Sequence, residues 1–277
     1  MSSAAAVSPR PAVAPSPHQR HPCSRLRLIA LLPLVLLVLS VCWAARAEAP
    51  GKDYKLVWSD EFDGEQLDTT KWDYRGLGKR RNAVNTKDAV RLDGQGHLVM
   101  TTSKAGDEYH TGMLGTQGKF EAVFGYFECR VKFQSQQGHW SAFWLQTPTM
   151  GKVVGDPKQS GTEIDIIEYL ARQPDLMQMN LHWDGYGKDH KHAGKQHKDA
   201  TLAEGWHVIG LEWTPDEYRF FLDGKEVWKT TSGVSHAKEF IILSMEVDKW
   251  GGDIATAKLP DSCQFDYVRV YQKEEKK

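Results

Sequence analysis

The stretch Gly161-Thr162-Glu163-Ile164-Asp165-Ile166-Ile167-Glu168-Tyr169 threads three carboxylates through a run of isoleucines. Side chains of a β-strand alternate between its two faces, so Glu163 and Asp165 would share one face while the intervening isoleucines point into a core. Strict alternation would leave Glu168 on the core face. A β-bulge at Ile166 and Ile167 would add one residue, shift the register by one and bring Glu168 round to the other two acids. The stretch therefore predicts a strand with one buried face and three acids on the other.

Two glutamates beside one aspartate suit the cleavage of a glycosidic bond. A retaining glycosidase needs one carboxylate as nucleophile and one protonated carboxylic acid, about 5–5.5 Å apart. Neighbouring like charges raise the pKa of one group, and Asp165 can hold or share a proton with the nucleophile. The alternative is a polar edge strand with solvated acids, and the buried isoleucine face counts against it. The residues alone do not say which glutamate plays which part.

The first 47 residues are predicted to be a secretory signal peptide. Arginines precede an apolar run from about residue 28 to residue 43, and Ala45-Arg46-Ala47 offers a small-x-small cleavage site before Glu48. A membrane anchor is the alternative, but the run is shorter than the roughly 20 residues of a span and contains Pro33. We expect a secreted product, periplasmic or extracellular, with no membrane contact after cleavage.

A lipid anchor is a minor alternative to free secretion. The segment Leu39-Ser40-Val41-Cys42 resembles a lipoprotein box, although Val41 stands where a small residue is expected. Cys42 would be the lipidated residue.

Residues 48–277 are expected to form a single domain, since about 230 residues suit one large sandwich or barrel. The formal net charge of the whole chain is −1, and the basic leader makes the remainder mildly acidic, so nucleic-acid binding is not indicated. Cys129 and Cys263 would survive processing, either as a disulfide or as two buried thiols. We expect a monomer, although the sequence does not determine the oligomeric state.

The pattern along the chain is that of an all-β protein. Short apolar or alternating runs recur between Gly, Asp and Asn, and no long stretch has a period of 3.6. So many strands in one domain predict two stacked antiparallel sheets. We expect strands at 55–58, 89–92, 97–103, 112–114, 118–123, 126–134, 141–146, 163–169, 178–183, 207–214, 217–222, 225–230, 239–246 and 264–272.

Two further segments are predicted to carry aromatic and polar side chains to the face of the acids. Alternation in 139–145 puts Trp140 and Trp144 on one side, where they would either stack on sugar rings or fill the core. In 177–183, Asn180 and His182 belong to a polar row opposite an apolar one.

A third segment, 241–246, repeats this alternation. Ser244 and Glu246 oppose Leu243 and Met245, and Trp250 follows in a Gly-rich loop. A polar row on such apolar strands calls for a ligand or water on that side.

Together these motifs carry a family resemblance. Glu163-x-Asp165-x-x-Glu168 matches the E-x-D-x-x-E signature of glycoside hydrolase family 16, the laminarinase, agarase and carrageenase relatives with a β-bulge in the active strand. Segments 58–64, 126–132, 206–225 and 265–271 resemble further motifs of that family, in family order. The likeness covers nearly the whole chain after the leader.

The resemblance implies a fold and a reaction. The fold would be a concanavalin-like β-jelly-roll sandwich with a substrate cleft across its concave sheet. The reaction would be endo-hydrolysis of a polysaccharide with retention of configuration, without a cofactor. Carried over by position, Glu163 is the nucleophile, Asp165 its assisting neighbour, and Glu168 the acid and then the base.

The resemblance also implies binding residues. Trp140 and Trp144 match cleft tryptophans, His182 matches a histidine beside the catalytic strand, and Arg81-Asn82 sits where relatives bind the glycone sugar. Many members carry a structural Ca²⁺ on the convex side. Its candidate ligands here are Glu61, a backbone oxygen near Gly96, and Asp266.

Departures from the family pattern leave the substrate open. Trp140-Ser141-Ala142 replaces the W-P-A of laminarinases, and the row of Ser244 and Glu246 looks more like the galactan-cleaving branches. Laminarin specificity is therefore in doubt, and both β-glucan and β-galactan, neutral or sulfated, remain candidates. The alternatives in function are a transglycosylase on the same polymers and a non-catalytic, lectin-like sandwich, which would have no need of three adjacent carboxylates.

The cation-rich segment 187–198 is predicted to be a solvated surface loop. Its alternatives are a clamp for anionic sugars, built from lysines, and a transition-metal site formed by His190, His192 and His197.

Overall fold

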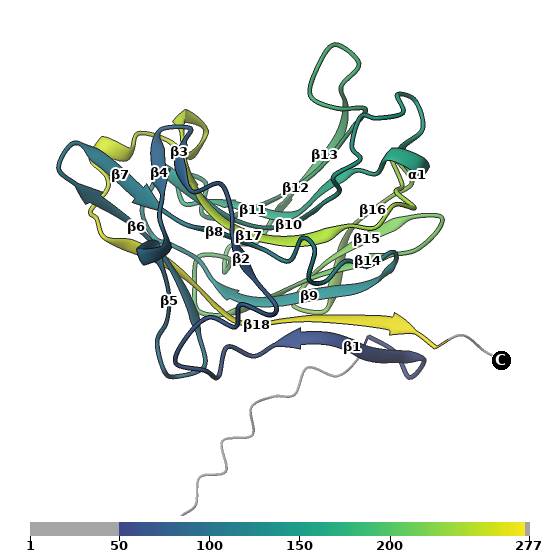
Figure 1. The fold of residues 1–277 in the computed structure, drawn as a ribbon, viewed down its shortest axis with the longest axis horizontal. Coiled ribbons are helices and arrows are strands. Elements are labelled where there is room, and N and C mark those ends of the chain that lie inside the picture. The colour runs from purple at the N-terminus through teal and green to yellow at the C-terminus, as the bar shows by residue number, and fades with distance from the viewer. Residues whose placement is uncertain (1–49, 275–277) are drawn as a thin grey trace, which may run out of the picture. The chain divides into compact units, whose positions relative to one another are not determined.

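Two stacked sheets make up the part of the chain that the computed structural model describes, residues 50–274 (Figure 1). The predicted signal peptide, its cleavage site and Cys42 lie outside these residues. No helix within 50–274 is long and apolar enough to cross a membrane.

The first sheet contains the acidic stretch and is bent so that its outer face is concave (Figure 1). Its strands in spatial order are β13 (Lys191–Lys198), β12 (Leu176–Trp183), β11 (Glu163–Leu170), β10 (His139–Gln146), β17 (Phe240–Val247), β8 (Met113–Gly115) and β2 (Asp73–Tyr74).

The second sheet lies below the first in Figure 1, and its strands β7, β4 and β3 rise along the left side. Its strands in spatial order are β16 (Lys225–Thr230), β15 (Tyr218–Leu222), β14 (His207–Trp213), β9 (Gly125–Lys132), β18 (Asp261–Lys273), β6 (Leu98–Ala105), β7 (Glu108–Thr111), β4 (Ala83–Asn85) and β3 (Gly78–Arg80). Beside this path, β1 (Tyr54–Asp60) pairs with β18 and β5 (Val90–Leu92) pairs with β6.

Within residues 50–274, helical structure is confined to short connections. These are α1 (Pro157–Ser160), η1 (Lys87–Ala89), η2 (Lys249–Gly251) and η3 (Ile254–Thr256).

The core lies between the two sheets and fixes the orientation of β11. Ile164, Ile166 and Ile167 are at most 1% exposed and pack in one cluster with residues of the second sheet, Leu211 among them. Each fully buried isoleucine contributes about 1.5–3 kcal/mol to folding. Turning β11 over would expose these residues, so the core holds its acids on the opposite, concave face.

The prediction of an all-β sandwich of two antiparallel sheets is confirmed, with one parallel pair, β4 and β7, as an addition. The predicted strand at 118–123 is wrong. Gly118 there has φ +76°, the segment turns, and only Ala122 forms a bridge, to Glu239.

The prediction of a surface loop at 187–198 is also wrong for most of the segment. Residues Lys191–Lys198 form the edge strand β13, paired along its whole length with β12. Its sequence, three lysines, two histidines, Ala193, Gly194 and Gln196, has no apolar alternation, so pairing with the exposed edge of β12 explains why it becomes a strand. The short strands β2, β3, β4 and β7 were likewise not predicted.

Of the two alternatives for the cysteines, the structure has buried thiols. Cys129 and Cys263 are both free and fully buried. Burial raises the pKa of each thiol above its usual range, so both are unreactive core residues.

Candidate active site

The bulge predicted in the acidic stretch is present in β11. Asp165 lies opposite Asn180 and Glu168 opposite Gln178, so three residues of β11 advance against two of β12. The same irregularity is seen on the other side, against β10. Because of the extra residue, all three acids project from one face of the strand.

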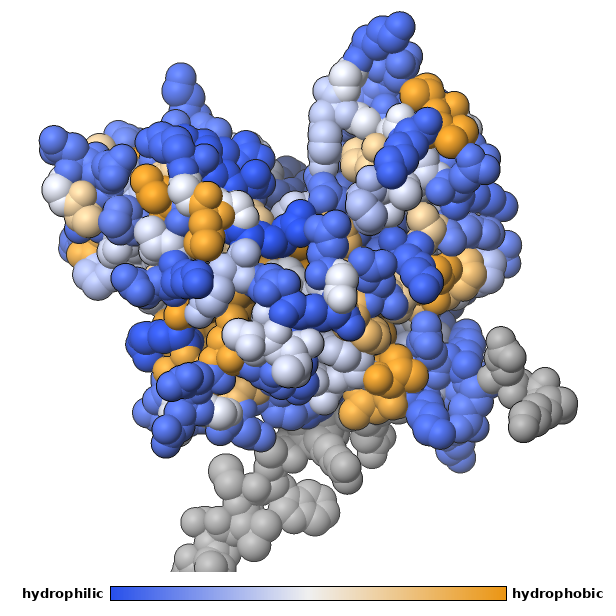
Figure 2. All heavy atoms as spheres, viewed as in Figure 1, coloured by the Kyte–Doolittle hydropathy of each residue, from blue (hydrophilic) through white to orange (hydrophobic). Residues whose placement is uncertain are grey.

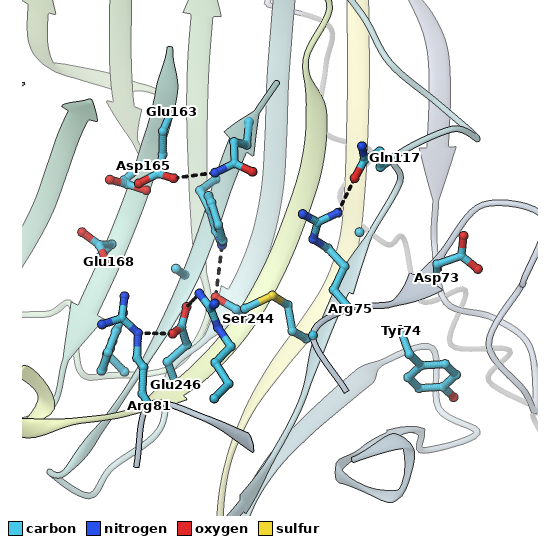
Figure 3. A pocket seen from close by; sticks show the side chains of 18 of the residues that line it. Asp73, Tyr74, Arg75, Arg81, Gln117, Glu163, Asp165, Glu168, Ser244 and Glu246 are labelled. Atoms are coloured by element: carbon cyan, nitrogen blue, oxygen red, sulfur yellow. Dashed lines mark hydrogen bonds and ion pairs between the residues drawn. The ribbon is translucent and has the colours of Figure 1, made fainter. Parts of the chain in front are cut away.

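That face forms one wall of a cleft with a volume of about 860 Å³. Figure 2 shows the molecule hollowed between the side that carries β3, β4 and β7 and the side that carries β12 and β13. The acids lie at one side of the cleft, Ser244 and Glu246 in its middle, and Arg75 and Tyr74 beyond them (Figure 3). The substrate path therefore crosses the strands of the concave sheet.

Glu163 is held by two donors from outside its own strand. The side-chain amide of Gln146 donates to its Oε2 over 2.9 Å, and the hydroxyl of Tyr186 donates to the same oxygen. Burial raises the pKa of Glu163 above its usual range, while both hydrogen bonds act against that rise. The two donors therefore favour the ionised carboxylate.

Glu168 has a different environment. Asn180 donates from its side-chain amide to Glu168 Oε2 over 2.8 Å. Burial raises the pKa of Glu168 to about 7, and the charges of Glu163 and Glu246 add to the rise. This carboxyl group can therefore hold a proton near neutral pH.

Asp165 lies between the two glutamates on the bulged strand. Burial, followed by the charges of Glu168 and Glu163, raises its pKa well above the usual range. His182 Nε2 lies 3.5 Å from Asp165 Oδ2. Burial, together with His190 and His192, lowers the pKa of His182 to about 4, so this imidazole is neutral at physiological pH.

The two predicted cleft tryptophans both line the cleft, on β10. Trp144 Nε1 donates to Ser244 Oγ over 3.1 Å. The guanidinium of Arg81 lies 5.2 Å from the ring centre of Trp140. Trp250 packs edge-on against Trp140 and is not among the residues that line the cleft.

Glu246 is fixed by a pair of arginines from the segment after β2. Arg80 Nη2 contacts its Oε1 over 3.0 Å, and Arg81 Nε donates to its Oε2. The predicted residue Asn82 is not among the cleft-lining residues and donates to Asp248 Oδ1 over 3.3 Å. Of the pair Arg81-Asn82, only the arginine therefore reaches the cleft.

Sequence reasoning missed several residues of the cleft. Gln146 continues the alternation of Trp140 and Trp144 on β10, so that pattern contained its signal. Tyr186 lies in the β12–β13 connection, and Arg75 and Arg80 lie near short strands without a periodic pattern. Nothing in the sequence around Tyr186 and Arg75 points to the cleft, whereas Arg80 directly precedes the predicted residue Arg81.

The predicted calcium ligands do not come together through their side chains. Arg269 binds the carboxylate of Glu61 through Nε and Nη2, at 3.0 and 2.6 Å, and Arg130 Nη1 binds Asp266 over 2.5 Å. A Cβ at Gly96 would lie 4.0 Å from the backbone oxygen of Glu61. Both carboxylates pair with arginine, and calcium binding stays a prediction.

The three histidines predicted as a transition-metal site are not brought together. His192 lies opposite His182, whereas His197 lies opposite Met177, five residues along β13 and therefore on the other face of the strand. His190 and His192 instead stack with His182, with ring centres 5.1 and 6.4 Å away. The lysine clamp stays a prediction, and Lys191 already pairs with Asp184 at 2.9 Å.

Comparison with known proteins gives consistent matches. The family model described as "Glycosyl hydrolases family 16" matches residues 77–269. A "Beta-glucanase" of Rhodothermus marinus is 30% identical over 89% of this chain and 95% of its own length. A "Keratan-sulfate endo-1,4-beta-galactosidase" of Sphingobacterium multivorum is also 30% identical, over 79% of this chain and 56% of its own length. The solved structure of a laminarinase from Flavobacterium sp. UMI-01 has a TM-score of 0.68 and 29% identity, covering 79% of this chain and 100% of that one.

Proposed function

The chain belongs to glycosyl hydrolase family 16 and is a glycosidase, and we propose that it cleaves β-linked polysaccharide internally, with retention of configuration. The observation that carries this proposal is the contrast between the two glutamates of β11. Burial raises the pKa of both, but Glu163 receives two hydrogen bonds that favour its ionised form, whereas Glu168 receives one from Asn180 and its pKa is raised to about 7. One acid is thus prepared to attack and the other to give a proton.

In this mechanism Glu163 attacks the anomeric carbon of the sugar. The bond to the leaving sugar oxygen breaks as Glu168 transfers its proton to that oxygen, leaving a glycosyl ester on Glu163. Glu168, now ionised, takes a proton from a water molecule, which attacks the anomeric carbon and releases Glu163. Asp165, whose pKa is raised, is the assisting neighbour that shares its proton with Glu163.

We propose a β-glucan or a β-galactan as the substrate backbone. The β-glucanase and the galactosidase relatives are equally similar in sequence, at 30% identity each. Trp140 and Trp144 offer ring faces for sugar stacking, and Glu246, fixed by two arginines, offers carboxylate oxygens to sugar hydroxyls. Transfer to a second sugar instead of water would use the same glycosyl ester.

A reducing-end release assay tests this function. The protein is incubated with laminarin, mixed-linkage glucan, agarose, porphyran, carrageenan and β-1,3-galactan, with Glu163→Ser as the matched blank. We expect new reducing ends from at least one polymer, absent in the blank. Equal release by both proteins would remove Glu163 from the nucleophile role, and silence on every polymer, together with binding to one, would favour a lectin-like function.

We also propose that residues 1–47 direct the protein out of the cell and are removed. The basic, apolar and small-residue segments in that order support this. N-terminal sequencing should show that the mature protein begins at Glu48. A membrane-bound protein that still carries residues 1–47 would contradict this proposal.

A further inference from the structure

Arg75 is the arginine of the cleft that lacks an acidic partner. Arg80 and Arg81 both form ion pairs with Glu246, and Arg81 also pairs with Asp248 at 3.6 Å. In the part of the chain that the structure describes, no carboxylate lies within 4.0 Å of the Arg75 guanidinium. The nearby Asp73 is instead paired with Lys119, at 3.0 Å. A guanidinium partly removed from water without a counter-charge is costly unless a ligand supplies one.

Contacts with neighbouring residues fix the position of the Arg75 side chain. A Cβ at Gly115 would come within 2.5 Å of Arg75 Cδ. The absence of a side chain at Gly115 therefore makes the space in which the Arg75 side chain crosses β8. The guanidinium lies 4.7 Å from the ring centre of Phe240 and donates through Nη1 to Gln117 Oε1 over 2.6 Å. The backbone is fixed as well, since Arg75 N donates to Met113 O over 2.9 Å.

Most of the hydrogen-bonding capacity of Arg75 is still free. A guanidinium has five N–H donors, and Gln117 uses one of them. No nitrogen of Arg75 is among the buried, unpartnered polar atoms of the described residues, so its remaining donors are accessible to solvent, and Arg75 is one of the residues that line the cleft. A planar fork of this kind binds a carboxylate or a sulfate through two parallel hydrogen bonds.

Arg75 also lies on the line that the substrate would follow. Its guanidinium covers Phe240 on β17, Phe240 lies opposite Gln146 on β10, and Gln146 donates to Glu163 on β11. Two strand spacings, about 10 Å, separate β17 from β11. Figure 3 shows Arg75 and Gln117 across the cleft from the acids. A polymer bound at Glu163 would therefore pass Arg75 with a sugar beyond the one that is attacked.

We propose that Arg75 is a subsite for an anionic substituent, a sulfate ester or a carboxylate, on the polysaccharide chain. This inference rests on the proposed function, because it places the anion on a polymer bound for cleavage at Glu163. It makes charge, in addition to backbone linkage, a determinant of which polymers the enzyme accepts. Neutral polymers would leave the guanidinium without a counter-charge.

The test compares polymers that share a backbone and differ in their anionic substituents. Laminarin and agarose are each prepared in unmodified, O-sulfated and carboxymethylated form, and kcat/KM is measured for the wild-type protein and for Arg75→Met, which keeps an unbranched chain over Phe240. We expect Arg75→Met to lower kcat/KM on an anionic form at least about tenfold more than on the neutral form, as loss of a charge-assisted hydrogen bond predicts. The arm with the larger loss, sulfated or carboxymethylated, identifies the anion.

Two controls separate charge recognition from structure. Arg91→Met removes an exposed arginine on β5 in the other sheet and should leave the ratio of anionic to neutral activity unchanged. Arg75→Lys keeps the charge without the fork and should fall between wild type and Arg75→Met on the anionic forms.

The outcomes distinguish this inference from the proposed function. Equal losses on neutral and anionic forms, or no loss on either, overturn the anion subsite while leaving glycosidase activity intact. If the wild-type protein cleaves none of the polymers, the proposed substrates are wrong. The anion subsite is then tested by affinity electrophoresis of the wild type and Arg75→Met in gels that contain the same polymers. Retardation by the sulfated or carboxymethylated polymer that Arg75→Met does not reduce would then overturn it.

Discussion

Glu163 and Glu168 are five residues apart on β11, and yet both side chains project into the same cleft. An odd separation would place them on opposite faces of a regular strand. The register shift between Asp165 and Glu168 removes that conflict while Ile166 and Ile167 both remain buried. The bulge therefore lets one strand supply a core face and a complete set of acids.

The pH dependence of activity follows from the two glutamates. We expect kcat/KM to fall as the pH rises through about 7, because Glu168 then loses the proton that it must donate. At low pH activity should fall as Glu163 becomes protonated, beginning at a higher pH than for an ordinary glutamate, since its pKa is raised. A series of kcat/KM measurements from about pH 4 to pH 9 checks both limbs. A rate that stays flat from about pH 6.5 to pH 8.5 would remove Glu168 from the acid role.

A substitution on the edge strand β13, away from the substrate, should shift the alkaline limb of the pH profile of kcat/KM. A Cβ at Gly194 would come within 2.5 Å of Asn180 Oδ1 and displace the amide that donates to Glu168. Because that hydrogen bond favours the ionised carboxylate, Gly194→Ala should raise the apparent pKa of the alkaline limb and lower kcat. Asn180→Ala should shift the limb in the same direction.

Gly187→Ala is the matched control for this experiment. It lies in the same β12–β13 hairpin, and a Cβ there would meet nothing within 4 Å. Its pH profile should equal that of the wild type. A shift in Gly187→Ala as large as that in Gly194→Ala would show that Asn180 is not the link.

Trp144 should contribute to substrate binding through its ring face. We expect Trp144→Ala to raise KM about tenfold or more, because a stacked ring and its buried area are lost together. Trp144→Phe keeps a ring but loses the hydrogen bond to Ser244, so its KM should rise less. Michaelis–Menten kinetics on the polymer found in the release assay provide the measurement. Equal KM values for Trp144→Ala and wild type would assign this residue to the core alone.

Glu239 should make the folded protein lose stability as the pH rises. It is fully buried, its Oε1 accepts from Thr162 N over 3.2 Å, and burial raises its pKa to about 8. A folded pKa above the unfolded value favours folding below about pH 4.5, and this contribution is lost as the pH rises through 8. The total is on the order of 5 kcal/mol.

Urea unfolding at about pH 5, 7 and 9 tests this linkage. Glu239→Gln should show a smaller fall in the free energy of unfolding between pH 5 and pH 9 than the wild type, with kcat retained. Glu108→Gln, at an exposed position on β7, should behave as the wild type. An identical pH slope in Glu239→Gln and wild type would mean that Glu239 is not the titrating group.

Local patterns were reliable where the alternation of apolar and polar residues was strong. The strands β10, β11, β12 and β17 were predicted within two residues at each end, together with the bulge that aligns the acids. The pattern failed at β13, where pairing with a neighbour rather than its own sequence makes the strand. It also failed at 118–123, where alternation is present but the chain turns.

The sequence by itself determined that three acids share one face of a strand, because the isoleucines between them must be buried. It also determined the sandwich, because each strand carries its own apolar side. Only the tertiary structure shows what shifts the pKa of each acid, because burial raises it and the donors that oppose the rise, Gln146, Tyr186 and Asn180, lie on other segments. The structure likewise decided that Arg80 and Arg81 pair with Glu246, whereas Arg75 has no acidic partner among the described residues. Burial and charge pairing arise from segments far apart in the chain, and no local pattern encodes them.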